Sequence, residues 1–243
     1  MKRNLVSAVA IAAAMVMGGV AEAADIRQPP PAVKAPAYVE PLFTWTGFYI
    51  GGNIGYGWSD GSGTVTNTGF FPAAIGARGP VSGDGDGILG GVQIGYNWQS
   101  GAFVYGIETD FQFSGGEGDF RGRVAPGAAN RFAGTAKNEW FGTIRGRLGY
   151  AVDTWLVYVT GGGAYTHNKI DGVTGTGVPF SASETGWTWT VGGGVEAALW
   201  ANWSVKAEYL YLATPDSVPT PVGTSIDGDV DTHVIRVGVN YRF

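Results

Sequence analysis

The chain has 243 residues and a formal net charge of −5, and it contains 42 glycines, 13% aromatic residues and no cysteine. Charged residues make up only 14% of it, whereas about a quarter is usual in soluble domains. The negative net charge argues against a nucleic-acid partner. Without cysteine, an exported form of this chain has to be stabilised by something other than disulfides.

Residues 1–23 have the three parts of a secretory signal peptide. Lys2 and Arg3 give a positive start, residues 5–20 are apolar, and Ala21-Glu22-Ala23 forms a small-x-small cleavage site. We therefore expect the mature chain to begin at Ala24-Asp25. No later apolar run reaches the roughly 20 residues that a membrane helix needs. A glycine- and aromatic-rich exported chain is then either a soluble β-sandwich or a membrane β-barrel.

Residues 24–44 are rich in proline, which disfavours both helices and central strands. This composition predicts an extended, polyproline-like tether, able to span several tens of ångströms at roughly 3.1 Å per residue. A plain disordered leader is the alternative, because chain termini are often poorly ordered.

Residues 45–243 show eight segments in which apolar and polar residues alternate, as in β-strands. The alternation is found near residues 48–58, 88–98, 103–113, 140–150, 155–165, 187–199, 203–211 and 235–243. Tight turns are expected near 99–101, 153 and 201–202, and long Gly-, Asp-, Thr- and Ser-rich connections at about 59–86, 115–136, 169–183 and 214–228. Short turns on one side and long loops on the other are typical of outer-membrane barrels and not of Greek-key sandwiches.

The nine tryptophans fall near the ends of the predicted strands. Aromatic residues at both rims of an apolar band form the girdles of a membrane barrel. About ten residues per strand, at ~3.3 Å each and tilted by ~40°, give a band near 25 Å. The predicted fold is therefore all-β, an eight-stranded antiparallel up-and-down transmembrane β-barrel with a Pro-rich N-terminal periplasmic segment.

In such a barrel the polar strand faces converge inside, and they carry charges of both signs. An eight-stranded barrel has an interior just wide enough for side chains to fill it, so we predict a packed salt-bridge network in the lumen. A narrow ion pathway is the alternative, and it needs a gap in that network. The predicted network residues are Glu108, Asp110, Arg145, Arg147, Glu196, Lys206, Glu208, Arg236 and Arg242.

The chain has two histidines, His167 and His233, as candidates for acid–base chemistry. Catalysis of this kind needs a histidine aimed by a carboxylate beside a nucleophile or an activated water. Asp231 lies on the same strand face as His233, but we favour rim positions for both and predict no enzyme and no cofactor.

Three aspartates in the DGDVD stretch, residues 227–231, have the spacing that begins an EF-hand loop. Thr232 and Gly238 stand where the motif requires glycine and glutamate, so the match fails. An acidic, solvated loop is the expectation here, and we predict no metal site.

The alternation in VIRVGVNYRF, residues 234–243, continues to Phe243. In a closed barrel the last strand pairs with the first, since an open edge inside lipid is costly. Tyr241 and Phe243 would face lipid at the periplasmic rim. This aromatic ending resembles the C-terminal signal by which bacterial outer-membrane proteins are recognised, and it implies the barrel-assembly machinery as a partner.

Several stretches resemble the alphaproteobacterial outer-membrane surface-antigen (immunogenic protein) family, a porin-like group with an OmpA-type eight-stranded barrel. They are WTGFYIGGNIGYGW (45–58), GGVQIGYNWQ (90–99), ETDFQFS (108–114), RGRLGY (145–150), TGGGAY (160–165) and the VGVNYRF end. The resemblance implies an outer-membrane location with the long loops at the cell surface, and contacts with outer-membrane lipid and lipopolysaccharide. It implies a role in envelope structure and surface antigenicity.

In some members of this family an N-terminal Ala-Asp is implied to be linked to peptidoglycan, and Ala24-Asp25 fits that pattern. The resulting hypothesis is a structural barrel that supports the envelope and tethers the outer membrane to the cell wall. Two alternatives stay open: a small passive channel, and a receptor that binds a ligand such as haem through the long loops.

Overall fold

The computed structural model describes residues 43–200, 202–213, 217–220 and 224–243. The predicted signal peptide, and the predicted tether up to residue 42, lie outside these ranges. The strands are β1 Gly47–Asn67, β2 Arg78–Ser100, β3 Phe103–Arg123, β4 Arg131–Val152, β5 Trp155–Thr174, β6 Pro179–Ala198, β7 Trp203–Ala213, β8 Ser217–Thr220 and β9 Thr224–Arg242, with one 3-10 turn, η1, at Ala128–Asn130. Within the described ranges, no helix has the length and apolar character to cross a membrane.

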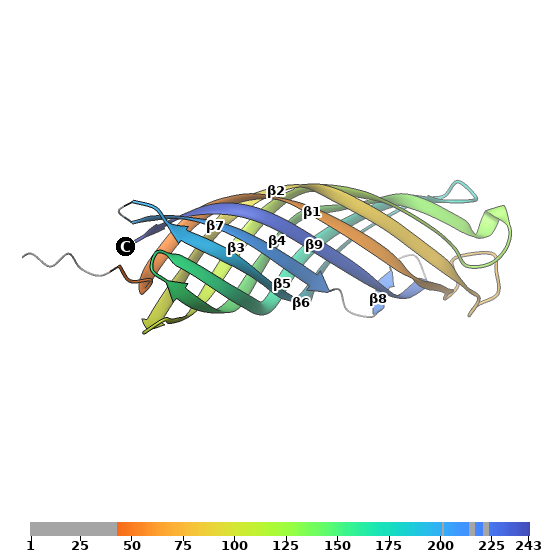
Figure 1. Cartoon of the computed structure of the whole chain (residues 1–243). Helices are drawn as coiled ribbons and strands as arrows, with labels where there is room; N and C mark the ends of the chain where they lie inside the picture. Colours follow the sequence, from red (N-terminus) through yellow and green to blue (C-terminus); the bar gives the residue numbers. More distant parts are fainter. Residues whose placement is uncertain (1–42, 201, 214–216, 221–223) are drawn as a thin grey trace, which may run out of the picture. The chain divides into compact units, whose positions relative to one another are not determined.

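Eight of these strands close into a ring of antiparallel neighbours, in the order β1-β2-β3-β4-β5-β6-β7-β9. The ring is closed by β9, which pairs with β1 from Tyr49↔Arg242 to Asn67↔Thr224, and Figure 1 shows the strands crossing the wall diagonally. The short strand β8 forms a hairpin with β9. The predicted eight-stranded up-and-down barrel is confirmed.

The alternation in sequence separates the two faces of the wall. In β3, Ile107 is more than half exposed on the outside, whereas the side chain of the next residue, Glu108, is buried in the lumen. This arrangement is the reverse of a soluble domain, because here the apolar face points outward and the charged face inward. A wall of this kind suits a hydrocarbon environment around it.

The strands run much further than the sequence predicted, so the expected long connections are wrong in extent. Residues 59–67 and 78–86 belong to β1 and β2 and pair with each other, for example at Asp60↔Asp84. Residues 118–123 and 131–136 likewise pair with each other as parts of β3 and β4. Glycine, serine and aspartate have low strand propensity, but the hydrogen-bonding partners in the ring override that local preference.

The ring has two different ends, here called the turn end and the loop end. The turn end carries the connections β2–β3, β4–β5 and β6–β7 together with the start of β1 and the end of β9. The loop end carries the segments 68–77, 124–130 and 175–178, among the residues described. Each strand of the ring runs from one end toward the other. The position of an inward residue along its strand therefore sets the height of its side chain in the lumen.

The lumen contains four stacked layers. The turn-end plug comprises Trp45, Val104, Ala151, Leu156 and Tyr158, and the charged layer lies above it. The apolar floor then comprises Leu89, Phe141, Ala164, Leu210, Leu212 and Val234. The loop-end cap comprises Val65, Phe71, Val124 and Phe132, with Phe120 and Phe180 packed against it.

Candidate functional site in the lumen and its lipid-facing belts

Glu108 on β3 is the centre of the charged layer. Its Oε1 lies 2.5 Å from Nη2 of Arg145 on the adjacent strand β4, and its Oε2 lies 2.8 Å from Nζ of Lys206, which comes from β7. Tyr49 donates a hydrogen bond to the same carboxylate at 2.8 Å. One buried carboxylate therefore joins strands from different parts of the ring.

Asp110 and Glu208 extend the network around two arginines. Asp110 accepts from Arg145 at 2.8 Å and from Arg236 at 2.9 Å. Glu208 pairs with Arg236 at 2.5 Å and with Arg145 at 3.1 Å. Each guanidinium thus contacts more than one carboxylate, and each carboxylate more than one cation.

Glu196 on β6 forms a second arm of the layer. Its Oε2 accepts from Arg147 at 2.8 Å, and its Oε1 accepts from Ser204 at 2.6 Å and from Asn240 at 2.9 Å. The guanidinium of Arg147 also lies 3.9 Å from the centroid of the Tyr158 ring. This cation–π contact joins the charged layer to the turn-end plug.

The charged layer fills the cross-section of the barrel. Four cations, Arg145, Arg147, Lys206 and Arg236, face four anions, Glu108, Asp110, Glu196 and Glu208, so the formal charges cancel, and all eight residues are buried. Buried charges are tolerated only when they are paired and hydrogen-bonded. This arrangement is therefore a packed network of paired charges.

Arg242 was predicted in the same network, but the structure places it apart. Its guanidinium lies over the rings of Phe43 and Trp45, at 4.4 and 5.1 Å from their centroids. The reason is its height: Arg242 is the last residue of β9, below the level of the charged layer. It therefore belongs to the turn-end plug.

Trp45 is the other residue whose role the sequence did not reveal. It was assigned to an aromatic girdle, yet its side chain is 1% exposed inside the turn-end mouth, so that assignment is wrong. Its backbone N–H donates to Gln99 at 2.6 Å, and Phe43 packs edge-on against its ring. Gly47, with a φ of 143°, lets the chain turn from the mouth into the wall.

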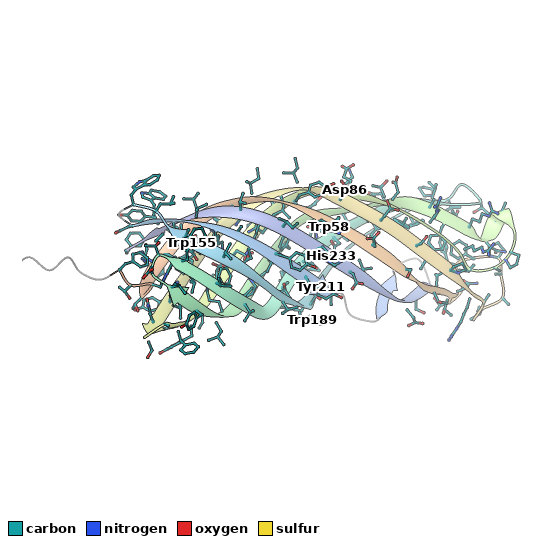
Figure 2. The ribbon with its side chains drawn as sticks, viewed as in Figure 1. Trp58, Asp86, Trp155, Trp189, Tyr211 and His233 are labelled. Atoms are coloured by element: carbon teal, nitrogen blue, oxygen red, sulfur yellow. The ribbon has the colours of Figure 1, made fainter. Side chains whose placement is uncertain are left out.

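The outer surface carries two belts of aromatic residues separated by aliphatic side chains. The turn-end belt includes Trp98, Trp155, Trp203, Tyr105, Tyr150 and Tyr241, and the upper belt includes Trp58, Trp140, Trp187, Trp189, Tyr165 and Tyr211. In Figure 2, Trp155 lies near the turn end, while Trp58, His233, Tyr211 and Trp189 lie in line about halfway along the strands. The ten residue-to-residue steps from Trp155 to Tyr165, at ~3.3 Å each with a ~40° tilt, give a band of about 25 Å.

Both histidines belong to the upper belt. His167 stacks on Trp140 at 5.5 Å, and its Nδ1 lies 2.9 Å from the hydroxyl of Thr185. His233 stacks on Trp58 at 5.4 Å, and its Nδ1 lies 2.7 Å from the Tyr209 hydroxyl. Asp231, weighed as a partner for His233, instead accepts a hydrogen bond from Tyr211. The contacts of both histidines therefore join belt side chains of neighbouring strands.

Tyr241 and Phe243 lie at the turn-end rim. The N–H of Phe243 donates to the carbonyl of Phe48 on β1 at 2.9 Å. The Phe243 ring packs against Tyr241 at 5.2 Å and Phe48 at 5.9 Å. The last residue thus extends the seam that closes the ring.

Among the described residues, no group of three His, Asp or Glu side chains is placed to hold a metal ion.

A closed ring with a charged interior and an apolar outer band between two aromatic belts defines an outer-membrane β-barrel. The protein-family model described as "Outer membrane protein beta-barrel domain" matches residues 10–243 of this chain. The chain therefore belongs to the outer-membrane β-barrel family and, within it, to the alphaproteobacterial surface antigens.

Three comparisons support this assignment. The chain is 40% identical over 238 residues to a 31 kDa outer-membrane immunogenic protein of Brucella melitensis biotype 1, covering 92% of this chain and 93% of that one. It is 30% identical to a 22 kDa outer membrane protein of Rhizobium leguminosarum bv. viciae, covering 85% and 82%. The fold matches the outer membrane protein OprG from Pseudomonas aeruginosa with a TM-score of 0.54 at 16% identity, over 82% of this chain and 96% of that one.

The protein is located in the outer membrane. In barrels of this membrane the short turns face the periplasm and the longer connections face the outside. The turn end, with the turn-end plug and Phe243, is therefore periplasmic, and the loop end lies at the cell surface.

Proposed function

We propose that this protein is a structural barrel that supports the cell envelope, and that it tethers the outer membrane to peptidoglycan through its N-terminus. The observation that carries this proposal is the sealed lumen. Eight paired charges fill the charged layer, and Trp45 closes the periplasmic mouth. A barrel closed at two heights is suited to mechanical anchoring and not to passive flow.

The position of Phe43 and Trp45 supports the tether. Both residues lie in the periplasmic mouth, where Arg242 packs over their rings. The described chain thus begins at the periplasmic end of the barrel, which supports a tether on the side of the cell wall. An amine at Ala24 on such a segment would be within reach of peptidoglycan.

Two further sets of contacts complete the proposal. The aromatic belts suit the headgroup levels of the two leaflets, so we propose phospholipid and lipopolysaccharide as the surrounding partners. Tyr241 and Phe243, at the end of the closing strand, are proposed as the segment that the barrel-assembly machinery recognises.

The tether is tested by mass spectrometry of cell-wall sacculi that have been boiled in detergent and digested with muramidase and trypsin. The expected product is the peptide Ala24–Arg27 carrying a muropeptide on its amine. The neighbouring tryptic peptide, residues 28–34, is a control from the same segment and should be recovered unmodified in equal amount.

Recovery of Ala24–Arg27 only as a free peptide in the detergent-soluble fraction would contradict the tether. A muropeptide on the Lys34 amine, visible as a missed cleavage after Lys34, would place the attachment at Lys34 and would also contradict attachment at Ala24. Either result leaves the barrel as a surface protein of the envelope.

A further inference from the structure

A group of exposed arginines lies on the outer wall at the loop end, and it is here called the arginine rim. Its members come from the start of β2, the end of β3 and the start of β4: Arg78, Arg121, Arg123 and Arg131. Arg123 stands directly opposite Arg131 in the register of β3 and β4, and Arg121 is two positions away on the same face. A Cβ at Gly79 would overlap the carbonyl oxygen of Arg123, so the start of β2 lies directly beside them.

The arginine rim faces away from the lumen. Phe120 and Phe132, which are the chain neighbours of Arg121 and Arg131, pack into the loop-end cap. Successive side chains of a strand point to opposite faces, so these guanidinium groups point outward from the flank of the barrel. Because the arginines stand on paired strands, their spacing is fixed before a partner arrives, and this lowers the entropic cost of binding.

The arginine rim has no anionic partner within the described part of the chain. Lys137 on the same wall pairs with Glu117 at 2.6 Å, whereas none of the four arginines forms an ion pair with a described residue. Like charges directly opposite each other in a sheet, such as Arg123 and Arg131, destabilise it. An anion bound between them would remove this repulsion, and the planar guanidinium group matches the paired oxygens of a carboxylate or sulfate.

The height of the arginine rim separates it from the lipid headgroups. Arg131 precedes Trp140 of the upper belt by nine residues on β4, and steps of ~3.3 Å at a ~40° tilt place it about 20 Å above that belt. The upper belt marks the level of the outer headgroups. The rim is therefore out of reach of the headgroups and accessible from outside the cell.

An acidic row lies between the upper belt and the arginine rim. Its members stand directly opposite one another on the neighbouring strands β9, β1, β2 and β3: Asp231, Asp60, Asp84 and Asp119. Figure 2 shows Asp86 on the same flank, in line with Trp58 and His233 of the upper belt. An anionic chain rooted in the leaflet would have to pass this row and would be repelled by it. A free polyanion that arrives from outside meets the arginines first.

We propose that the arginine rim binds a free polyanionic polysaccharide, with sulfate or carboxylate groups, outside the cell. Four clustered guanidinium groups complement the charge of such a chain, and a flexible chain can follow the curved flank of the barrel. This binding function goes beyond the envelope role and does not depend on the tether.

The surroundings of the rim favour a polysaccharide over a nucleic acid. The residues directly beside Arg121, Ser82 and Ala133, are small, whereas single-stranded nucleic acids bind to aromatic side chains on which their bases stack. Duplex DNA has a persistence length of about 50 nm, so it cannot bend around the flank of one barrel. A flexible, highly charged sugar chain meets both conditions.

The probe for the test is dextran sulfate of low molecular weight. It is titrated calorimetrically against the full mature protein in phosphatidylcholine nanodiscs, and the signal of empty nanodiscs is subtracted. We expect saturable binding that weakens about 100-fold between 50 and 200 mM salt, as counterion release from four contacts predicts. Uncharged dextran of the same length should not bind, and duplex DNA of similar total charge should bind at least tenfold more weakly.

The opposed pair of arginines is tested by the double variant Arg123→Gln with Arg131→Gln, which should weaken binding at least tenfold. The matched control is Lys137→Gln with Lys169→Gln, which removes the same charge from the same wall. Binding by the control should stay within about twofold of the wild type, because both lysines are already paired. The urea midpoint of the arginine variant should not fall, since the two arginines repel each other.

Folding of each variant is checked by the shift in gel mobility between unheated and heated samples. If the first arginine variant does not fold, Arg78→Gln with Arg121→Gln removes two charges from the same rim and should cause a similar loss. Equal losses from the arginine and lysine variants would show that only net charge matters and would overturn the proposal. So would the absence of saturable binding, or equal affinity for duplex DNA.

A second measurement tests whether the partner is free or belongs to the surrounding leaflet. The lipopolysaccharide that remains bound to protein extracted from outer membranes is quantified for the wild type and the Arg123→Gln, Arg131→Gln variant. Equal amounts are expected, because the acidic row disfavours chains that rise from the leaflet. A smaller amount on the variant would place lipopolysaccharide on the arginines and overturn the assignment of a free partner.

Discussion

Glu108 and Lys206 lie four strands apart in the ring, on β3 and β7, yet their side chains meet across the lumen with both Nζ–Oε distances below 3 Å. Neighbouring strands alone do not predict this pair. It identifies Glu108 as the residue through which opposite sides of the barrel are joined.

Glu108→Gln should therefore destabilise the barrel strongly. The substitution leaves Arg145 and Lys206 buried without their shared carboxylate, and breaking a buried pair costs about 3–5 kcal/mol. The free energy of unfolding is measured by urea titration in lipid vesicles. Glu117→Gln is the control, because its partner Lys137 lies on the exposed outer surface and exposed pairs contribute ~0–1 kcal/mol. Equal effects of both substitutions would contradict the network.

The sealed lumen predicts no steady conductance for the wild-type protein in planar lipid bilayers. Trp45→Ala should not open it, because the charged layer remains. Glu108→Ala with Arg145→Ala, combined with Trp45→Ala, removes side chains at both closed heights and should give measurable conductance. Conductance of the wild type that changes with charge substitution at Arg145 would support the channel alternative instead.

The turn-end plug should contribute to stability through Trp45. Replacing a buried tryptophan by alanine typically costs about 3–5 kcal/mol, and Trp45 also carries the contact with Arg242. Trp155→Ala is the matched control, since that ring is more than half exposed on the lipid side. Urea titration in the same vesicles compares the two, and a smaller loss for Trp45→Ala than for Trp155→Ala would contradict a sealing role.

Phe243→Ala should reduce the fraction of protein that is folded in the outer membrane. The ring closes the seam with Phe48 and ends the strand proposed to be recognised during assembly. Phe103→Ala removes an equally peripheral aromatic from β3 and serves as the control. Folded protein is quantified by gel mobility of unheated membranes, and an equal decrease in both variants would remove the special role of the terminus.

Asp60→Asn should stabilise the barrel at low ionic strength. Asp60 stands directly opposite Asp84 on β2 and Asp231 on β9, and like charges at such cross-strand positions repel each other. The gain in the urea midpoint should shrink as salt is added, because screening weakens the repulsion. Asp171→Asn is the control, since Lys169 lies 3.6 Å from that carboxylate; a gain there of the same size would contradict the explanation.

The sequence by itself determined which face of each strand sees lipid and which sees the lumen. Alternation has a period of two, and in a strand the direction of a side chain depends only on its own position. Ile107 and Glu108 therefore had assigned sides before any neighbour was known. The same local property located the belts, the charged lumen and the turns near 99–101 and 153.

Only the tertiary structure decided how far the strands continue and which lumen charges meet. Residues 59–67 read as a loop because their own propensity is low, and partners far away in sequence hold them in β1. Lys206 faces Glu196 of the neighbouring strand in register, but its side chain pairs with Glu108, and Glu196 pairs with Arg147. Strand tilt and stagger set the height of every inward residue, and these are properties of the closed ring. The burial of Trp45 arises in the same way, because it depends on what surrounds the lumen and not on the residue in isolation.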